Sequence, residues 1–143
     1  GCGGRGCWER YGSATALIQL TQLEMERDRE SMLWELVDGD SYKVQGRTPF
    51  QAARLGDAAA KRVLSKYLQG LSLGMINLVN ILQPEIICLG GGVSNAEDDL
   101  LLDPLRELVW RGCFDKGNHT RIEKASLGND AGVVGAALLC NLV

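Results

Sequence analysis

Apolar residues recur at helical spacing in the first part of the chain. They follow Ser13, a residue type that caps helices, and they predict a helix that ends near Asp28. The polar stretch of residues 27–47 is expected to hold one short helix around residues 32–37, with Leu33 and Trp34 turned inward. The apolar positions of the first helix are Ala16, Leu17, Leu20 and Leu23.

Thr48 and Pro49 predict the start of a second, short helix. Threonine caps a helix, and proline is tolerated in the first turn because its missing N–H would have no partner there. This helix is expected to end near Leu55 and Gly56.

Asp57 then caps the longest predicted helix, from Ala58 to about Leu82. Its apolar face widens toward the C-terminal end, so we expect that half to be buried on most sides. Gly70 and Gly74 inside the helix favour close packing against another helix, since each glycine weakens the helix by up to about 1 kcal/mol. The apolar face comprises Val63, Leu64, Tyr67, Leu68, Leu71, Met75, Ile76, Leu78, Val79 and Leu82.

The second half of the chain alternates strands and helices. Residues 85–89 are rich in β-branched side chains and predict a buried strand, followed by Gly90, Gly91 and Gly92. A helix is expected from Ala96 or Leu100 to Trp110, a strand over residues 120–125 and a last helix over residues 130–142. This order predicts an α/β domain, or most of one.

Length and charge limit the function classes. The 143 residues, 45% of them hydrophobic, fit one globular domain. A net charge of -3 and a pI near 5.2 argue against a nucleic-acid-binding surface and a polybasic membrane patch. The sequence has no apolar stretch long enough to span a bilayer. It opens on a glycine-rich loop without Met or a signal sequence, which led us to expect a fragment of a longer protein.

Two cysteines in this opening loop are candidate metal ligands. Cys2 and Cys7 are separated by four residues, three of them glycine, so their thiolates could reach one tetrahedral metal. Two ligands do not complete a structural zinc site, and free thiols in a glycine-rich turn are the alternative interpretation. Cys88, Cys113 and Cys140 are expected to be small core residues.

Gly90, Gly91 and Gly92 form a second candidate site. A glycine run at the carboxyl end of a buried strand exposes backbone N–H groups and leaves room for a phosphate or nucleotide. The run is neither a G-x-G-x-x-G motif nor a P-loop, so neither standard nucleotide chemistry is implied. A strand-to-helix turn without a ligand is an equally weighted alternative.

A third glycine-rich segment covers residues 127–137. Asn129 or Asp130 is expected to cap the last helix. Its small residues offer a flat surface to another helix or to the ring of a ligand. His119, the only histidine, lies in a polar loop and receives no role.

Together and in this order, the three segments resemble the ROK family of repressors, open reading frames and sugar kinases. The family signature Cys-x-Cys-Gly-x-x-Gly-Cys-x-Glu is matched from its second cysteine onward by residues 2–9. The glycine run resembles the family's adenosine-binding turn. Residues 127–137 look like the last connecting helix of the fold.

The resemblance implies a fold and a set of site residues. Residues 1–143 would form the C-terminal lobe of an actin-like, hexokinase-like (ribonuclease H-like) α/β ATPase fold, with a mixed sheet and packed helices, and residues 1–12 would be its zinc and sugar loop. Cys2 and Cys7 match zinc ligands, and Glu9 matches the glutamate that binds sugar hydroxyls. Gly90, Gly91, Gly92 and Val93 match the nucleotide-binding turn.

The function implied is that of a cytoplasmic kinase that uses ATP and Mg²⁺ to phosphorylate the 6-hydroxyl of a hexose. Glucose is the expected hexose, and the protein would be a homodimer or homotetramer. The phosphate loop, the catalytic base and the remaining zinc ligands would lie upstream, so the fragment alone is expected to be inactive, with its zinc site incomplete. A sugar-responsive repressor of the same family is the alternative, and the intact glycine run favours the kinase.

Overall fold

The computed structural model describes residues 3–117 and 120–139, and they form seven α-helices, four short 3₁₀ helices and two strands. The α-helices are α1 (Glu9–Gly12), α2 (Ala14–Arg27), α3 (Leu33–Leu36), α4 (Thr48–Arg54), α5 (Ala58–Leu82), α6 (Leu102–Gly112) and α7 (Ala131–Leu139). The strands are β1 (Ile86–Leu89) and β2 (Arg121–Lys124). The 3₁₀ helices are η1 (Ser41–Lys43), η2 (Gly92–Asn95), η3 (Asp98–Leu100) and η4 (Gly128–Asp130).

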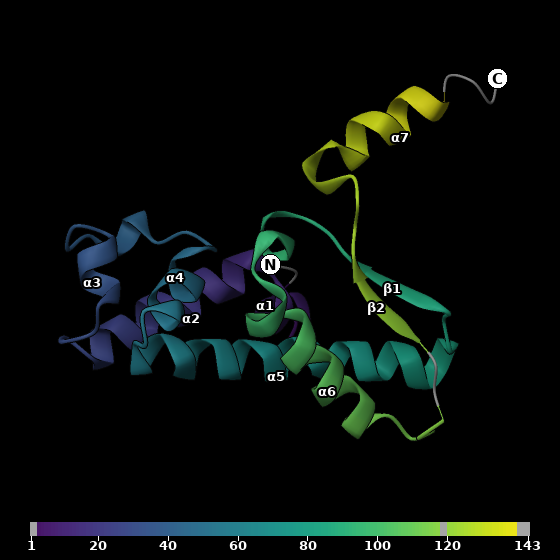
Figure 1. Cartoon of the computed structure of the whole chain (residues 1–143), viewed down its shortest axis with the longest axis horizontal. Coiled ribbons are helices and arrows are strands. Elements are labelled where there is room, and N and C mark those ends of the chain that lie inside the picture. The colour runs from purple at the N-terminus through teal and green to yellow at the C-terminus, as the bar shows by residue number, and fades with distance from the viewer. Residues whose placement is uncertain (1–2, 118–119, 140–143) are drawn as a thin grey trace.

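Helix α5 is the element on which most of the others pack. Figure 1 shows it as one long helix, with α2, α3 and α4 gathered at its N-terminal end and the two strands over its C-terminal half. Helices α1, α2, α4 and α6 all contact it. The predicted inward positions of α5 from Val63 to Leu71 are buried, as are Met75 and Val79.

The two strands form a small parallel sheet. Ile86 pairs with Arg121 and Leu89 with Lys124, and α6 makes the connection from one strand to the other. The described part of the chain is therefore mostly helical, and its sheet is parallel rather than mixed. The prediction of a buried first strand was wrong, because only one face of the sheet is covered and Ile86 and Cys88 are exposed. Cys113 is buried as predicted.

The C-terminal half of α5 also differs from the prediction. Ile81 is 77% exposed and Leu82 66% exposed. A two-stranded sheet and α6 cover only one side of this half, so the widened apolar face has no layer over its other side. Helix α7 projects away from the other elements (Figure 1), and none of its described side chains is buried. No helix within the described ranges is both long enough and apolar enough to cross a membrane.

The helix ends follow the capping signals closely. Ser13 caps α2 by accepting a hydrogen bond from the Ala16 N–H. Helix α5 ends at Leu82, one residue before Gln83 turns into the left-handed region and two before Pro84. The predicted cap at Thr48 was placed one residue late: Thr48 is already helical, and its hydroxyl accepts from the Gln45 N–H before the helix.

Ion pairs between a buried carboxylate and two half-exposed cations join α2 to α5. The Glu24 carboxylate is almost fully buried and accepts from Arg62 Nε at 2.6 Å and Lys66 Nζ at 3.2 Å. The hydrogen bond from Arg62 lowers the pKa of Glu24 in spite of its burial, with Lys66 adding to the effect. A carboxylate paired in this way fixes the register of α2 along α5.

Asp57 is a buried carboxylate that joins two helices. Its Oδ1 accepts from the Ala60 N–H at 2.7 Å and caps α5, while its Oδ2 accepts from the Met32 N–H at 2.8 Å and the Ser31 hydroxyl at 3.0 Å. Burial alone would raise the pKa of Asp57, but the hydrogen bonds from Ala60, Met32 and Ser31 lower it overall. One side chain thus holds the start of α3 against the start of α5.

Asp57→Ala should lower the free energy of unfolding by about 2–4 kcal/mol, because it removes a helix cap and leaves buried donors unpaired. Since the folded pKa is depressed below its ordinary 3.8, this stabilisation is present above that pH and is lost as the pH falls through the folded pKa. Urea titrations at pH 7 and pH 3 measure both effects. The control is Asp40→Ala, which removes a cap for the Tyr42 N–H alone and should lower the free energy of unfolding by less than about 1 kcal/mol. Equal decreases in the free energy of unfolding in the two variants would contradict the role given to Asp57.

Candidate functional site

The glycine run lies at the carboxyl edge of the parallel sheet. Strand β1 ends at Leu89, and Gly91 has φ +80° and ψ -176°, a conformation open almost only to glycine. This backbone turns the chain from the strand into η2. The predicted glycine turn is therefore present, and at Gly91 the backbone requires the residue type.

Two side chains hold the turn in place. The buried Ser94 hydroxyl donates to the Gly91 carbonyl at 2.7 Å, closing the turn on itself. Lys124 of β2 donates from Nζ to the Ala96 carbonyl at 2.6 Å and pairs with Asp98 at 2.5 Å. The segment after the glycines is thus tied to the neighbouring strand.

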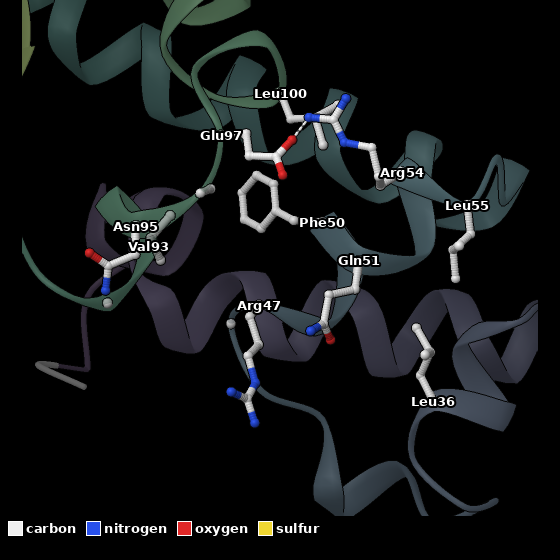
Figure 2. Close-up of a pocket in the computed structure, with 13 residues that line it drawn as sticks. Leu36, Arg47, Phe50, Gln51, Arg54, Leu55, Val93, Asn95, Glu97 and Leu100 are labelled. Carbon is white, nitrogen blue, oxygen red and sulfur yellow. Dashed lines mark ion pairs between the residues drawn. The ribbon is translucent and has the colours of Figure 1, made fainter.

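A hollow of about 680 Å³ opens beside this turn, between η2 and η3 on one side and α4 on the other. Gly92 and Val93 belong to its wall. Figure 2 shows the Phe50 ring of α4 pointing toward the segment that carries Val93 and Asn95, while the Gln51 side chain points toward Arg47. Its size is within the usual range for small-molecule sites, and its lining combines an aromatic ring with amide and charged groups. The other lining residues are Leu36, Gly46, Arg47, Arg54, Leu55, Ala96, Glu97 and Leu100.

An ion-pair cluster joins the two walls of this hollow. Arg54 of α4 donates to both oxygens of Asp99 at 2.8 Å and also pairs with Glu97 (Figure 2). The Arg54 guanidinium lowers the pKa of Asp99. Bidentate geometry of this kind is the strong form of an ion pair, although exposure to solvent weakens it.

The cysteine loop leads into the short helix α1. Gly3 and Gly6 both have positive φ, so the loop turns tightly just before Cys7, which is half-buried. Glu9 is the first residue of α1, exposed, and no side chain of residues 3–117 or 120–139 forms a hydrogen bond or ion pair with its carboxylate. Cys2, the other predicted metal ligand, lies outside the described residues, as do His119 and Cys140. Within the described ranges, no group of three or more His, Cys, Asp or Glu side chains is placed to hold a metal ion.

A smaller hollow, of about 200 Å³, connects the end of α1 with the glycine turn. Gly12 and Ser13 line one side, and the run from Gly90 to Ser94 lines the other. Tyr67 of α5 lines it as well, and its hydroxyl donates to the Gly12 carbonyl at 3.0 Å. Burial raises the pKa of Tyr67 to about 12, so the phenol keeps its proton at neutral pH. The structure thus brings the end of α1 and the glycine turn together, and η4, at the start of the third predicted segment, contacts η2, whereas α7 itself projects away.

Several residues around the site have no sequence motif that predicts their place there. Phe50, Gln51 and Arg54 reach the hollow because α4 packs opposite a segment more than 40 positions later in the sequence, and no local spacing encodes that. Trp8 lies inside the cysteine motif but received no role. Trp8 packs against Gly74 of α5. The glycines at positions 70 and 74 predicted a close contact at this place but did not identify the residue that makes it.

Comparison with known proteins places these features in a family. Residues 1–142 match the model of the ROK family. The chain is 35% identical over 147 aligned residues to the glucokinase of Streptomyces coelicolor, covering 96% of this chain and 44% of that protein. A crystal structure of a ROK family glucokinase from Streptomyces griseus in complex with glucose and AMPPNP is 33% identical, with a TM-score of 0.86 over 96% of this chain and 45% of that one.

A second solved structure shows how widely this fold is used. A ROK family transcriptional regulator, a homolog of the E. coli MLC protein, is 22% identical and has a TM-score of 0.76 over 96% of this chain and 33% of that one, a likeness of fold alone. The chain spans less than half the length of these relatives. Its arrangement of helices and sheet corresponds to part of the actin-like ATPase fold, and the chain belongs to the ROK family.

Proposed function

We propose that this chain is the C-terminal lobe, residues 1–143, of an ATP-dependent hexokinase of the glucokinase type. The observation that carries the proposal is the hollow beside Gly92 and Val93, which opens from a turn that only glycine can make. A regulator that binds sugar has no need to hold a nucleotide, so a hollow of this size beside the glycine turn favours the kinase. The glucokinases among its relatives support the same assignment.

In this proposal the adenosine of ATP occupies the larger hollow, with Gly92 and Val93 in its wall, and Gly90 and Gly91 border the smaller hollow on the other side of the turn. Side chains are absent or small there, so a base and a ribose can approach the main chain closely. Phe50 supplies an aromatic surface, and Gln51 and Asn95 supply amide groups for hydrogen bonds. The phosphates would then extend along the turn toward the smaller hollow and α1.

The hexose lies at the other end, against Glu9. A carboxylate can accept hydrogen bonds from two adjacent hydroxyl groups, and the Glu9 carboxylate has no competing partner among the described side chains. Cys7 would give one thiolate to a structural zinc ion together with Cys2. Because a closed zinc site takes four ligands, we assign the remaining donors to the part of the protein outside this chain.

The chemical step divides between this lobe and the rest of the protein. Transfer of the γ-phosphoryl to the 6-hydroxyl requires in-line positioning, charge neutralisation by the Mg²⁺ that accompanies ATP, and a base for the hydroxyl proton. The described residues supply the positioning: the turn for the nucleotide and Glu9 for the sugar. We assign the base to the other lobe, which closes over the sugar and keeps water from the phosphoryl group. A cytoplasmic homodimer or homotetramer remains the expected setting.

The full-length protein, given ATP and Mg²⁺, should phosphorylate glucose faster than fructose, mannose or N-acetylmannosamine. Sugar phosphate and ADP, followed separately, measure this and exclude simple ATP hydrolysis. Residues 1–143 alone should show no turnover, since they lack the base. Sugar binding without any turnover in the full-length protein would instead support the ROK regulator.

Gly91→Ala should raise the KM for ATP by about tenfold or more and leave the KM for the sugar within about twofold, because a side chain at φ +80° forces the turn to rearrange. Gly39→Ala is the matched control, since Gly39 has φ +76°, open space around it and no place in either hollow. Initial-rate kinetics on both variants make the comparison. Equal effects of the two substitutions on the KM for ATP would contradict a nucleotide role for the turn.

Glu9→Gln should lower kcat/KM for the hexose by a factor of about 10 to 100, the value of one charge-assisted hydrogen bond. The amide keeps the size of the side chain, so the unfolding midpoint should not change. Glu35→Gln, at another exposed short-helix glutamate, is the control and should leave kcat/KM unaltered. A wild-type kcat/KM in Glu9→Gln would exclude Glu9 from the sugar site.

A further inference from the structure

The Trp8 indole lies directly on helix α5 at Gly74. A Cβ added to Gly74 would stand 1.9 Å from Cε2 of the ring, 2.2 Å from Cδ2 and 2.3 Å from Nε1. No side chain fits at that distance, so the contact exists only because position 74 is glycine. Alanine at position 74 would force the indole off the helix.

Three more contacts hold α1 against the same face of α5. The Trp8 indole N–H donates to the Gly70 carbonyl at 3.1 Å. A Cβ added to Gly70 would stand 2.9 Å from the Cβ of Tyr11, so the two helices also touch backbone to backbone there. At the end of α1, Tyr67 donates to the Gly12 carbonyl. A helix of four residues has no stability of its own, so these contacts determine where α1 lies.

Stability alone does not account for this arrangement. Two glycines inside α5 weaken the helix, each by up to about 1 kcal/mol. The Trp8 indole that packs against them stays 40% exposed, so its burial contributes only part of the stabilisation that a fully buried indole would give. What the arrangement provides is a fixed position for a short helix whose first residue is Glu9.

We propose that Trp8 and Gly74 are positioning residues for Glu9, an inference that rests on the proposed function. Successive side chains on a helix point roughly 100° apart, so an indole seated on α5 directs the neighbouring carboxylate away from α5. The Glu9 side chain is exposed, as this geometry requires. The glycine pair in α5 therefore controls the sugar site from a helix that does not carry the sugar ligand.

Gly74→Ala in the full-length protein should raise the KM for glucose about tenfold, while the KM for ATP stays within about twofold. Trp8→Ala should give a similar increase. The double variant should be no worse than Trp8→Ala alone, because without the indole there is nothing for the new methyl group to displace. Asn77→Ala, at an exposed position one turn further along α5, is the control and should change neither KM.

Amide hydrogen exchange over residues 8–12 gives a second readout on the same proteins. Exchange should be faster in Gly74→Ala and unchanged in Asn77→Ala. Additive effects in the double variant overturn the inference, as does a Gly74→Ala protein with lower kcat but an unchanged KM for glucose and unchanged exchange. A wild-type protein that phosphorylates no hexose instead removes the proposed function and the role of Glu9 with it. The two failures are therefore distinguishable.

Discussion

The burial of one face of α5 is the constraint on which the rest of the structure depends. Tyr67, Leu71 and Met75 lie along that face and are buried. Helices α1, α2, α4 and α6 pack on α5, and two of them, α1 and α4, carry parts of the candidate site. Glu9 is the first residue of α1, and α4 forms one wall of the larger hollow. The positions of these residues are thus set relative to one long helix.

Tyr67 links the two ends of the proposed site. Tyr67 lines the smaller hollow, and its hydroxyl donates to the Gly12 carbonyl at the end of α1. The same hollow is bounded by the glycine turn. Tyr67 therefore lies between the end of α1 and the hollow that the turn borders. Because its raised pKa keeps the phenol protonated, the hydrogen bond to Gly12 persists across the physiological pH range.

The sequence was most informative where a local rule decides the conformation. Ser13 and Asp57 mark helix starts because their side chains accept backbone N–H groups, and both caps are present. The glycine turn was predictable because Gly91 must take a positive φ. Burial was less predictable. Ile86 and Leu82 were predicted to be core residues and are exposed, because whether an apolar side chain is covered depends on a layer that the local pattern does not reveal.

The candidate site shows the same limit in another form. Glu9 and the glycine turn were found through a motif, whereas Phe50 and Arg54 face the hollow only because α4 packs across from η3. Gly74 is partly predictable: a glycine inside a helix predicts that another element packs closely there, but it does not identify that element.

A chain of this kind binds more readily than it reacts. Its described residues offer a glycine turn, an aromatic-lined hollow and a carboxylate with no partner among the described side chains, and under the proposed function these would hold the substrates in place. Phosphoryl transfer gains most of its rate from positioning and electrostatics. The same scaffold can therefore serve a kinase, or a regulator that only senses sugar, with the difference made by the groups that face it. One fold is accordingly shared by a glucokinase and a transcriptional regulator, and the larger hollow carries more weight in the proposed function than the overall shape does.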